Sequence, residues 1–370
     1  MSFVIPPYPF DRLEEILAIA ERHEGGKVDC SIGTPCDAPS PMVLDALAAA
    51  TSHRGYPRSV GSPTFRSAIS AYLQRRYAVS VPDDSIAACV GTKEFVASLP
   101  GYLRLRDESR DTVLYPATSY PTYEMGARLA SLRALPVAMV DGMLDLDSIS
   151  ASDAARALCL WVNSPSNPTG RVEDLSRAAS WGRQNGVLVA SDECYSEFTW
   201  TSSPRSILQE GSEGVVAVHS ISKRSNLAGV RAGFYAGDSE LVGFLSLARQ
   251  HAGLMVAGPV QEAVAVAYGD DSHVDAQRAR YHERLELMGT ALRDAGFTVE
   301  PCEGSFYLWA TEGRNGFETA QRVAEASGLV VSPGEFYGDR SDTYIRVAMV
   351  QPLSRLEIVA QRLRESSLNR

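Results

Sequence analysis

Lysine is nearly absent from this 370-residue chain, and this scarcity indicates that the few lysines present have specific roles. The chain holds three, Lys27, Lys93 and Lys223, among 35 basic residues, so arginine supplies almost all of the positive charge. Each lysine then has to be explained by what its primary amine can do, and a primary amine can form a Schiff base. Lys223 draws attention first, because Ser220-Ile221-Ser222-Lys223 is followed by the glycine-rich segment 229–233.

Other absences exclude whole classes of protein. The six cysteines form no Cys-x-x-Cys pair and no secreted disulfide framework, so they are expected to be reduced thiols. The first residues lack a basic segment followed by an apolar core, and no apolar run approaches the length of a membrane span. A net charge of −10 argues against nucleic acid and allows a small charged metabolite. We expect a cytoplasmic protein with no metal, membrane or nucleic-acid partner.

Short β-like runs alternate with amphipathic helical stretches through the first three quarters of the chain, which predicts an α/β fold with a mostly parallel, helix-covered sheet. Helices are expected after Glu94 and over 175–184. The expected strands are 86–90, 112–115, 134–140, 157–162, 187–190, 215–218 and 232–236.

After Gly258-Pro259 the pattern changes. A long charged helix over about 276–295 leads to strands near 297–299, 305–309 and 343–347, with a helix near 317–327. This predicts a second, smaller α+β domain. The expected division is an amino-terminal arm with part of the small domain over 1–34, a large cofactor-binding domain over 35–275, and the small domain over 276–370.

Two segments upstream of Lys223 supply what its amine would need if the partner were pyridoxal phosphate. The loop 163–170, which contains Asn167, closes one expected strand with hydrogen-bonding turn residues. The next strand ends in Ser191-Asp192-Glu193-Cys194-Tyr195, where open α/β sheets place their sites.

The residue types fit that cofactor. A carboxylate at Asp192 would keep the pyridine nitrogen protonated, and a protonated ring stabilises a carbanion at the substrate α-carbon. Asn167 and Tyr195 would hydrogen-bond the ring's 3-oxygen. The phosphate needs backbone N–H groups at a helix start, hydroxyls and a guanidinium. The expected cradle is Gly91, Thr92, Lys93, Ser220, Ser222 and Arg231.

In this order and spacing, from about Gly33 to Arg346, the motifs resemble those of the class I/II aminotransferases, pyridoxal phosphate enzymes of the aspartate aminotransferase fold. The resemblance implies that Lys223 forms the Schiff base and carries the proton, with Asp192 and Tyr195 as the other catalytic residues. Arg346 and Gly33 then correspond to positions at the substrate α-carboxylate, which Asn167 also borders.

Two further positions follow from the same resemblance. Tyr120 matches the aromatic residue that stacks on the cofactor ring, and Tyr56 matches the tyrosine that reaches the phosphate of the neighbouring subunit. The match at Tyr56 implies a homodimer with shared active sites. Considered alone, each of these residues would be explained as part of a turn, as a helix cap or as a packed aromatic side chain.

Three longer runs, 91–101, 120–130 and 222–234, look more like the N-succinyldiaminopimelate aminotransferases. That likeness implies transfer of an amino group between glutamate and N-succinyl-2-amino-6-oxopimelate in diaminopimelate and lysine biosynthesis. Arg54, Arg58 and Lys93 are candidates for binding the distal carboxylates. Thr118 and Val230 depart from the residues frequent in such relatives, proline and tyrosine.

The same fold and cofactor also serve other reactions, because the protein decides which bond at the α-carbon breaks. The alternatives are a general aspartate or aromatic aminotransferase and a carbon–sulfur β-lyase, with cyclopropane-forming synthases and acyl transferases in the same group. A cofactor-sensing regulator is disfavoured, because the motifs begin by Gly33 and leave no room ahead for a DNA-binding segment.

Overall fold

The computed structural model describes residues 4–366, and the chain divides into two compact units. The larger unit comprises Ala38–Ala279 together with Glu303–Ser305. The smaller unit comprises the residues up to Asp37, Arg280–Cys302 and the residues from Phe306 onward. Each unit is described by itself below.

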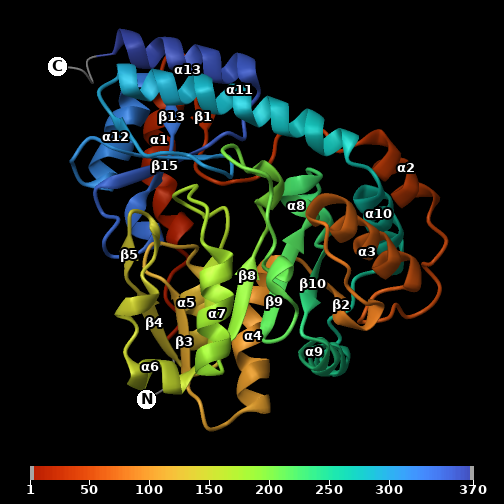
Figure 1. Cartoon of the computed structure of the whole chain (residues 1–370). Helices are drawn as coiled ribbons and strands as arrows, with labels where there is room; N and C mark the ends of the chain where they lie inside the picture. The colour runs from red at the N-terminus through yellow and green to blue at the C-terminus, as the bar shows by residue number, and fades with distance from the viewer. Residues whose placement is uncertain (1–3, 367–370) are drawn as a thin grey trace. The chain divides into compact units, whose positions relative to one another are not determined.

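A seven-stranded sheet forms the centre of the larger unit, coloured from orange to green in Figure 1. β10 runs antiparallel to both of its neighbours, and the other four neighbouring pairs are parallel. The prediction of a mostly parallel, helix-covered sheet is confirmed. Across the sheet, the strands are β2 (Ile86–Cys89), β10 (Gly233–Gly237), β9 (Val215–Ser220), β8 (Leu188–Asp192), β7 (Ala157–Asn163), β3 (Thr112–Pro116) and β4 (Arg133–Val137).

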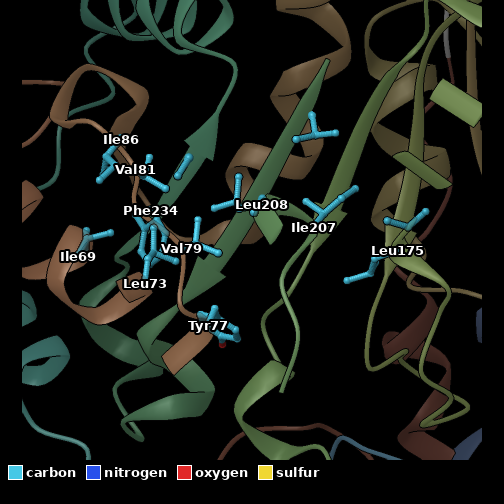
Figure 2. Close-up of a cluster of buried hydrophobic side chains, with 14 of the residues drawn as sticks. Ile69, Leu73, Tyr77, Val79, Val81, Ile86, Leu175, Ile207, Leu208 and Phe234 are labelled. Atoms are coloured by element: carbon cyan, nitrogen blue, oxygen red, sulfur yellow. The ribbon is translucent and has the colours of Figure 1, made fainter. Parts of the chain in front are cut away.

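Helices cover both faces of this sheet, because alternate strand residues point to opposite sides. On β9, Ala217 belongs to one buried cluster, and Val216 and Val218 belong to the other. Figure 2 shows part of the first cluster, in which Leu73, Leu175 and Phe234 are drawn. The first cluster is completed by α2 (Pro41–Ala49), α3 (Pro63–Tyr77), α7 (Leu175–Asn185) and α10 (Gly258–Gly269), and the second by α4 (Thr92–Arg106), α5 (Thr122–Leu129) and α9 (Ser239–His251).

The prediction of a single strand over 134–140 is wrong, because the strand ends at Val137. β4 ends there, and β5 (Met139–Val140) pairs antiparallel with β6 (Met143–Leu144) as a hairpin. The two turn residues, Asp141 and Gly142, have φ of +52° and +78°. Positive φ at both central residues is the requirement of a type I′ turn, for which Asp-Gly is a preferred sequence. A short helix, α6 (Ala151–Arg156), follows.

The smaller unit is α+β, as expected. Its four-stranded sheet is antiparallel throughout, in the order β11 (Thr298–Val299), β12 (Tyr307–Thr311), β15 (Tyr344–Ala348) and β14 (Ser332–Pro333). A second, two-stranded sheet pairs β1 (Val28–Asp29) with β13 (Leu329–Val330) in parallel. The helices that supply residues to this unit are α1 (Glu14–Arg22), the long α11 (Ser272–Asp294), α12 (Gly316–Ser327) and α13 (Leu353–Glu365).

Among residues 4–366, no helix has the length and apolar character needed to cross a membrane.

Candidate active site

Lys223 lies directly after the central strand β9, in the one-turn helix α8 (Ile221–Arg224). The helix begins there because Ser220 is its N-cap: the Ser220 hydroxyl accepts a hydrogen bond of 3.0 Å from the Ser222 backbone N–H. Ser220 and Ser222 are buried, and the Lys223 side chain is half-buried. The strand end and the cap therefore fix where the lysine leaves the sheet.

Asp192 is the last residue of the neighbouring strand β8, and its side chain is 6% exposed. The Tyr123 phenol donates a hydrogen bond of 2.8 Å to Oδ2, and the Cys194 backbone N–H donates one of 3.1 Å to Oδ1. Burial raises the pKa of Asp192 above its ordinary value, although these two donors act to lower it. A buried carboxylate of this kind favours a cationic partner.

Asn167 is brought to the same sheet edge through Asn163, the last residue of β7. The Asn163 side-chain amide donates to the Asp192 carbonyl at 2.8 Å, and the Asn163 side-chain oxygen accepts from the Asn167 N–H at 2.7 Å. The peptide bonds Ser164–Pro165 and Asn167–Pro168 are both cis, and Asn167 itself is buried. The asparagine loop is thus tied to the end of β8.

Two of the predicted tyrosines are connected to Asp192, Tyr120 through the Tyr123 ring and Tyr195 along the chain. The ring of Tyr120, just before α5, lies edge-on to the Tyr123 ring at 6.0 Å between centroids, and Tyr123 holds the Asp192 carboxylate. Tyr195 follows three residues after Asp192 and is 7% exposed. The thiol of Cys194, the residue before Tyr195, lies 3.3 Å from the Thr92 hydroxyl, which connects the loop after β8 to the start of α4.

The start of α4 meets a guanidinium. Gly91 precedes the helix with φ of +79°, and a Cβ at this position would overlap Nη2 of Arg231. Arg231 is itself left-handed, with φ of +53°, and its Nη1 donates to the Ala228 carbonyl at 2.9 Å. Glycine is needed at position 91 both for its conformation and for the space that the guanidinium takes.

Strand register explains why these residues converge. Gly233 of β10 pairs with Cys89, the last residue of β2, and with Ser220, the last residue of β9. The ends of β2, β9, β8 and β7 therefore meet at one edge of the sheet, where ligands bind in open α/β folds. That edge carries Gly91, Thr92, Asn167, Asp192, Tyr195, Ser220, Ser222, Lys223 and Arg231.

The remaining predicted residues are either exposed or in the smaller unit. Lys93 is in the first turn of α4 with an exposed side chain, and Arg54, Arg58 and Tyr56 are exposed in the segment between α2 and α3, Tyr56 to 97%. Gly33 and Arg346 belong to the smaller unit. Arg346 is 3% exposed on β15, and its Nη2 donates to the Ser31 carbonyl at 2.6 Å.

Prediction from the sequence overlooked two residues at this edge, Tyr123 and Asn163. Both stood inside segments that drew attention, since Tyr123 follows Tyr120 by three residues and Asn163 opens the asparagine loop. Their contacts with Asp192 join residues 69 and 29 positions apart. Spacing along the chain gives no signal for such pairs.

The groups at this edge fit pyridoxal phosphate. The first N–H groups of α4, the hydroxyls of Ser220 and Ser222 and the Arg231 guanidinium suit a phosphate dianion. The buried Asp192 carboxylate suits a protonated ring nitrogen, and Tyr120 offers an aromatic face. A primary amine, Lys223, stands at the end of the strand beside Asp192.

Comparison with known proteins gives a consistent result. The family model described as "Aminotransferase class I and II" matches residues 26–363. The 4-dedimethylamino-4-oxo-anhydrotetracycline transaminase OxyQ of Streptomyces rimosus is 42% identical, covering 97% of this chain and 99% of that protein. The LL-diaminopimelate aminotransferase of Desulforudis audaxviator is 33% identical over 98% of each. A solved structure of a probable N-succinyldiaminopimelate aminotransferase from Thermus thermophilus matches with a TM-score of 0.88 and 30% identity, covering 96% of this chain and 99% of that one.

Proposed function

Because the chain belongs to the class I and II aminotransferases, which use pyridoxal phosphate and share the aspartate aminotransferase-like fold, we propose that it transfers an amino group between glutamate and N-succinyl-2-amino-6-oxopimelate. One observation carries the choice of substrate. Across nearly its whole length the chain is similar to proteins named for diaminopimelate, one in its free form and one in its N-succinyl form. Both names contain diaminopimelate, a seven-carbon diamino dicarboxylate, to which the second adds an N-succinyl group with a third carboxylate.

The cofactor would be held by the residues at the sheet edge of the larger unit. Pyridoxal phosphate supplies, when bound, a protonated ring that withdraws electrons from the substrate α-carbon. Gly91, Thr92 and Arg231, with the hydroxyls of Ser220 and Ser222, bind its phosphate in this proposal. Tyr120 would cover the ring face, and Lys93 would add positive charge near the start of α4.

The chain's own groups then divide the work at the reacting carbon. With the cofactor bound, the Asp192 carboxylate would keep the ring nitrogen protonated, and Asn167 and Tyr195 would hydrogen-bond the ring oxygen. Nζ of Lys223 would be the amine that holds the cofactor, and this amine would accept and return the substrate α-proton. Arg346 fixes the substrate α-carboxylate through its planar fork, which decides the face that the α-carbon presents.

The acceptor carries two carboxylates besides the one assigned to Arg346, and these ask for further cationic or amide donors. Arg54, Arg58 and Lys93 are the candidates, since all three are exposed and lie near site motifs in the chain. Replacement of the residue that binds the succinyl carboxylate should raise KM for the succinylated substrate and leave KM for glutamate unchanged.

A second candidate function is amination of a ring ketone. The identity to the anhydrotetracycline transaminase, 42%, exceeds that to the Desulforudis diaminopimelate enzyme, 33%. The name of that relative denotes transamination of a 4-oxo-anhydrotetracycline, a polycyclic acceptor without an α-carboxylate on the reacting carbon.

The deciding experiment follows the cofactor absorbance of the holoenzyme in a stopped-flow half-reaction. N-succinyl-LL-diaminopimelate is compared with aspartate, alanine and phenylalanine, and the Lys223→Ala variant serves as the blank. A specificity constant for the succinylated substrate well above those of the common amino acids supports the proposal. Faster conversion of a common amino acid refutes it and favours a general aminotransferase. In a parallel assay, aminated product from 4-oxo-anhydrotetracycline would favour the second candidate.

A further inference from the structure

Two tyrosine rings border the guanidinium of Arg346 in the smaller unit. The guanidinium carbon lies 4.1 Å from the centroid of the Tyr307 ring and 4.8 Å from that of the Tyr337 ring. Both distances fall within the range of cation–π attraction. Tyr307 is on β12, and Tyr337 ends the short 3-10 helix η7 (Gly334–Tyr337), so the two rings reach Arg346 from different elements.

The Tyr307 ring occupies space that a glycine leaves open. A Cβ at Gly33 would overlap the hydroxyl oxygen of Tyr307 and crowd two of its ring carbons. Gly33 has an ordinary negative φ, so glycine is needed here for room. This accounts for Gly33 by a contact with Tyr307, in addition to the role at the substrate carboxylate expected from the sequence.

The Tyr337 ring is held by the small sheet. It meets Trp309 edge-on, with 5.8 Å between centroids, and Trp309 is stacked on Tyr344 at 4.9 Å. Trp309 lies opposite Arg346 in the strand register. Burial raises the pKa of Tyr337 to about 12, so its ring stays neutral over the usual range of assay pH.

These contacts bear on how well an arginine can bind a carboxylate. A guanidinium on a long side chain loses rotamer freedom when it is ordered by a ligand, unless the protein has already fixed it. Arg346 is fixed by the two rings and by its hydrogen bond to the Ser31 carbonyl. Burial also lowers the local dielectric, which strengthens a charge-assisted bond.

We propose that Tyr307 and Tyr337 are positioning residues that hold the Arg346 guanidinium ready for the substrate carboxylate. The proposal rests on the function proposed above, in which Arg346 binds that carboxylate. Neither tyrosine is required to touch the reacting atoms. Their effect should therefore appear in carboxylate recognition and not in proton transfer.

The test uses two ligands that differ only in the carboxylate. 2-Methylalanine and tert-butylamine both lack an α-proton, so neither can be transaminated, and tert-butylamine has a methyl group in place of the carboxylate. Spectral titration of the holoenzyme's cofactor band gives a dissociation constant for each. Their ratio measures the preference for a carboxylate without any turnover.

We expect Tyr307→Leu and Tyr337→Leu each to reduce this preference roughly 10-fold, the size of a desolvated cation–π contact, and to leave tert-butylamine binding unchanged. Tyr307→Phe and Tyr337→Phe keep the ring and should stay within about 3-fold of the wild type. The matched control is Phe244→Leu, which removes a ring 6.0 Å from the guanidinium carbon of Arg106 in the larger unit and should not alter the preference.

Foldedness is checked by thermal unfolding and by retention of the cofactor band. If a leucine variant fails this check, pentafluorophenylalanine at the same position keeps the shape of the ring but removes its negative face, and the same loss is expected. An unchanged preference in the ring-altered proteins overturns the inference.

Arg346→Gln separates this failure from failure of the proposed function. If this variant loses the preference while the tyrosine variants keep it, only the positioning role is refuted. If Arg346→Gln keeps the preference, the carboxylate role of Arg346 itself is refuted, and the positioning role with it.

Discussion

Asp192 is a carboxylate whose chemistry depends on neighbours drawn from several parts of the larger unit. Its two oxygens accept hydrogen bonds from the Tyr123 phenol and the Cys194 N–H, and its backbone carbonyl accepts one from Asn163. Burial raises its pKa, which disfavours the charged form until a cation is present. Lys223 follows the neighbouring strand β9, in a short helix whose N-cap is Ser220. The roles of both residues remain predictions that single substitutions can test.

Lys223→Ala should abolish covalent attachment of the cofactor and lower transamination by roughly 10⁴-fold or more, since the Schiff-base amine and the proton carrier are lost together. Borohydride reduction followed by mass spectrometry checks attachment independently of activity. The wild type should gain the mass of the reduced cofactor and the variant should not. Lys27→Ala is the control, because it removes another of the three lysines, one that pairs with Glu21 in the smaller unit, and should keep the adduct. Substantial turnover by Lys223→Ala would refute the assignment.

Asp192→Asn should keep the covalently attached cofactor but slow removal of the substrate α-proton by roughly 100-fold, because the ring nitrogen loses its charged partner. The half-reaction with α-deuterated substrate measures this, and the isotope effect should rise as proton removal becomes limiting. Tyr123→Phe, which removes one hydrogen bond but keeps the carboxylate, should have a smaller effect. A wild-type rate in Asp192→Asn would mean that another group protonates the ring.

At the scale of elements, prediction from the sequence was best where a pattern is local. The alternation of apolar residues located the strands of the large sheet to within a few residues, and serine, glycine and asparagine marked the loops at their ends. It is wrong over 134–140, where the apolar run continues past the end of β4 and the Asp141-Gly142 turn forms a hairpin. The hairpin formed there, β5–β6, is fastened to the rest of the unit by a buried glutamate.

That glutamate, Glu173, is 8% exposed, and both of its carboxylate oxygens accept from the Leu144 N–H of β6, at 3.1 and 3.3 Å. Its own N–H donates to the Ser164 hydroxyl at the start of the asparagine loop. Burial raises the pKa of Glu173 to about 7. The hydrogen bond from the Leu144 N–H and the charge of Arg171 act to lower this pKa, and Asp174 and Glu303 act to raise it. Glu173 therefore joins the hairpin to the loop in a pH-dependent way.

The sign follows from linkage. Between its ordinary pKa of 4.5 and about 7, Glu173 binds more protons in the folded than in the unfolded chain. Its contribution to stability is complete below the lower value, declines as pH rises, and is lost above the higher one, a difference of roughly 3 kcal/mol. Glu173→Gln should remove this dependence.

Thermal unfolding of both proteins from pH 5 to pH 8 measures the effect. The difference in stability, Glu173→Gln minus wild type, should be larger at pH 8 than at pH 5. Curves that stay parallel across this range would contradict the prediction.

At the scale of the whole molecule, the oligomeric state depends on more than one chain. The homodimer stays a prediction, as does the assignment of residues 35–275 to a cofactor-binding domain. Tyr56, the residue that implies shared sites, is 97% exposed, and Met42 and Leu44 of α2 are exposed nearby in the sequence. We propose that this segment reaches the cofactor phosphate of a second copy.

Light scattering should give about twice 40.0 kDa. Tyr56→Ala and Lys223→Ala should each be poorly active at limiting cofactor, and co-expression should restore roughly a quarter of wild-type activity, because half of random dimers are mixed and each has one intact site. Asp192→Asn replaces Tyr56→Ala in the control: Asp192 and Lys223 lie at the ends of neighbouring strands of one chain, so mixed dimers of these two variants hold no intact site and should show no recovery. A monomer, or no recovery on mixing, would refute the shared site.

The sequence by itself determined the family, the fold and the cofactor, because these depend on local patterns and their order: periodic apolar runs, turn residues at strand ends, and a scarce lysine after a serine cap. Only the tertiary structure decided which buried groups meet. Tyr123 reaches Asp192 across 69 residues, and Arg346 reaches the Ser31 carbonyl across 315. The contacts of the Tyr307 and Tyr337 rings with Arg346 are likewise visible only in the tertiary structure. Such contacts depend on strand register and packing, and the energies of a carboxylate or a guanidinium depend on them in turn.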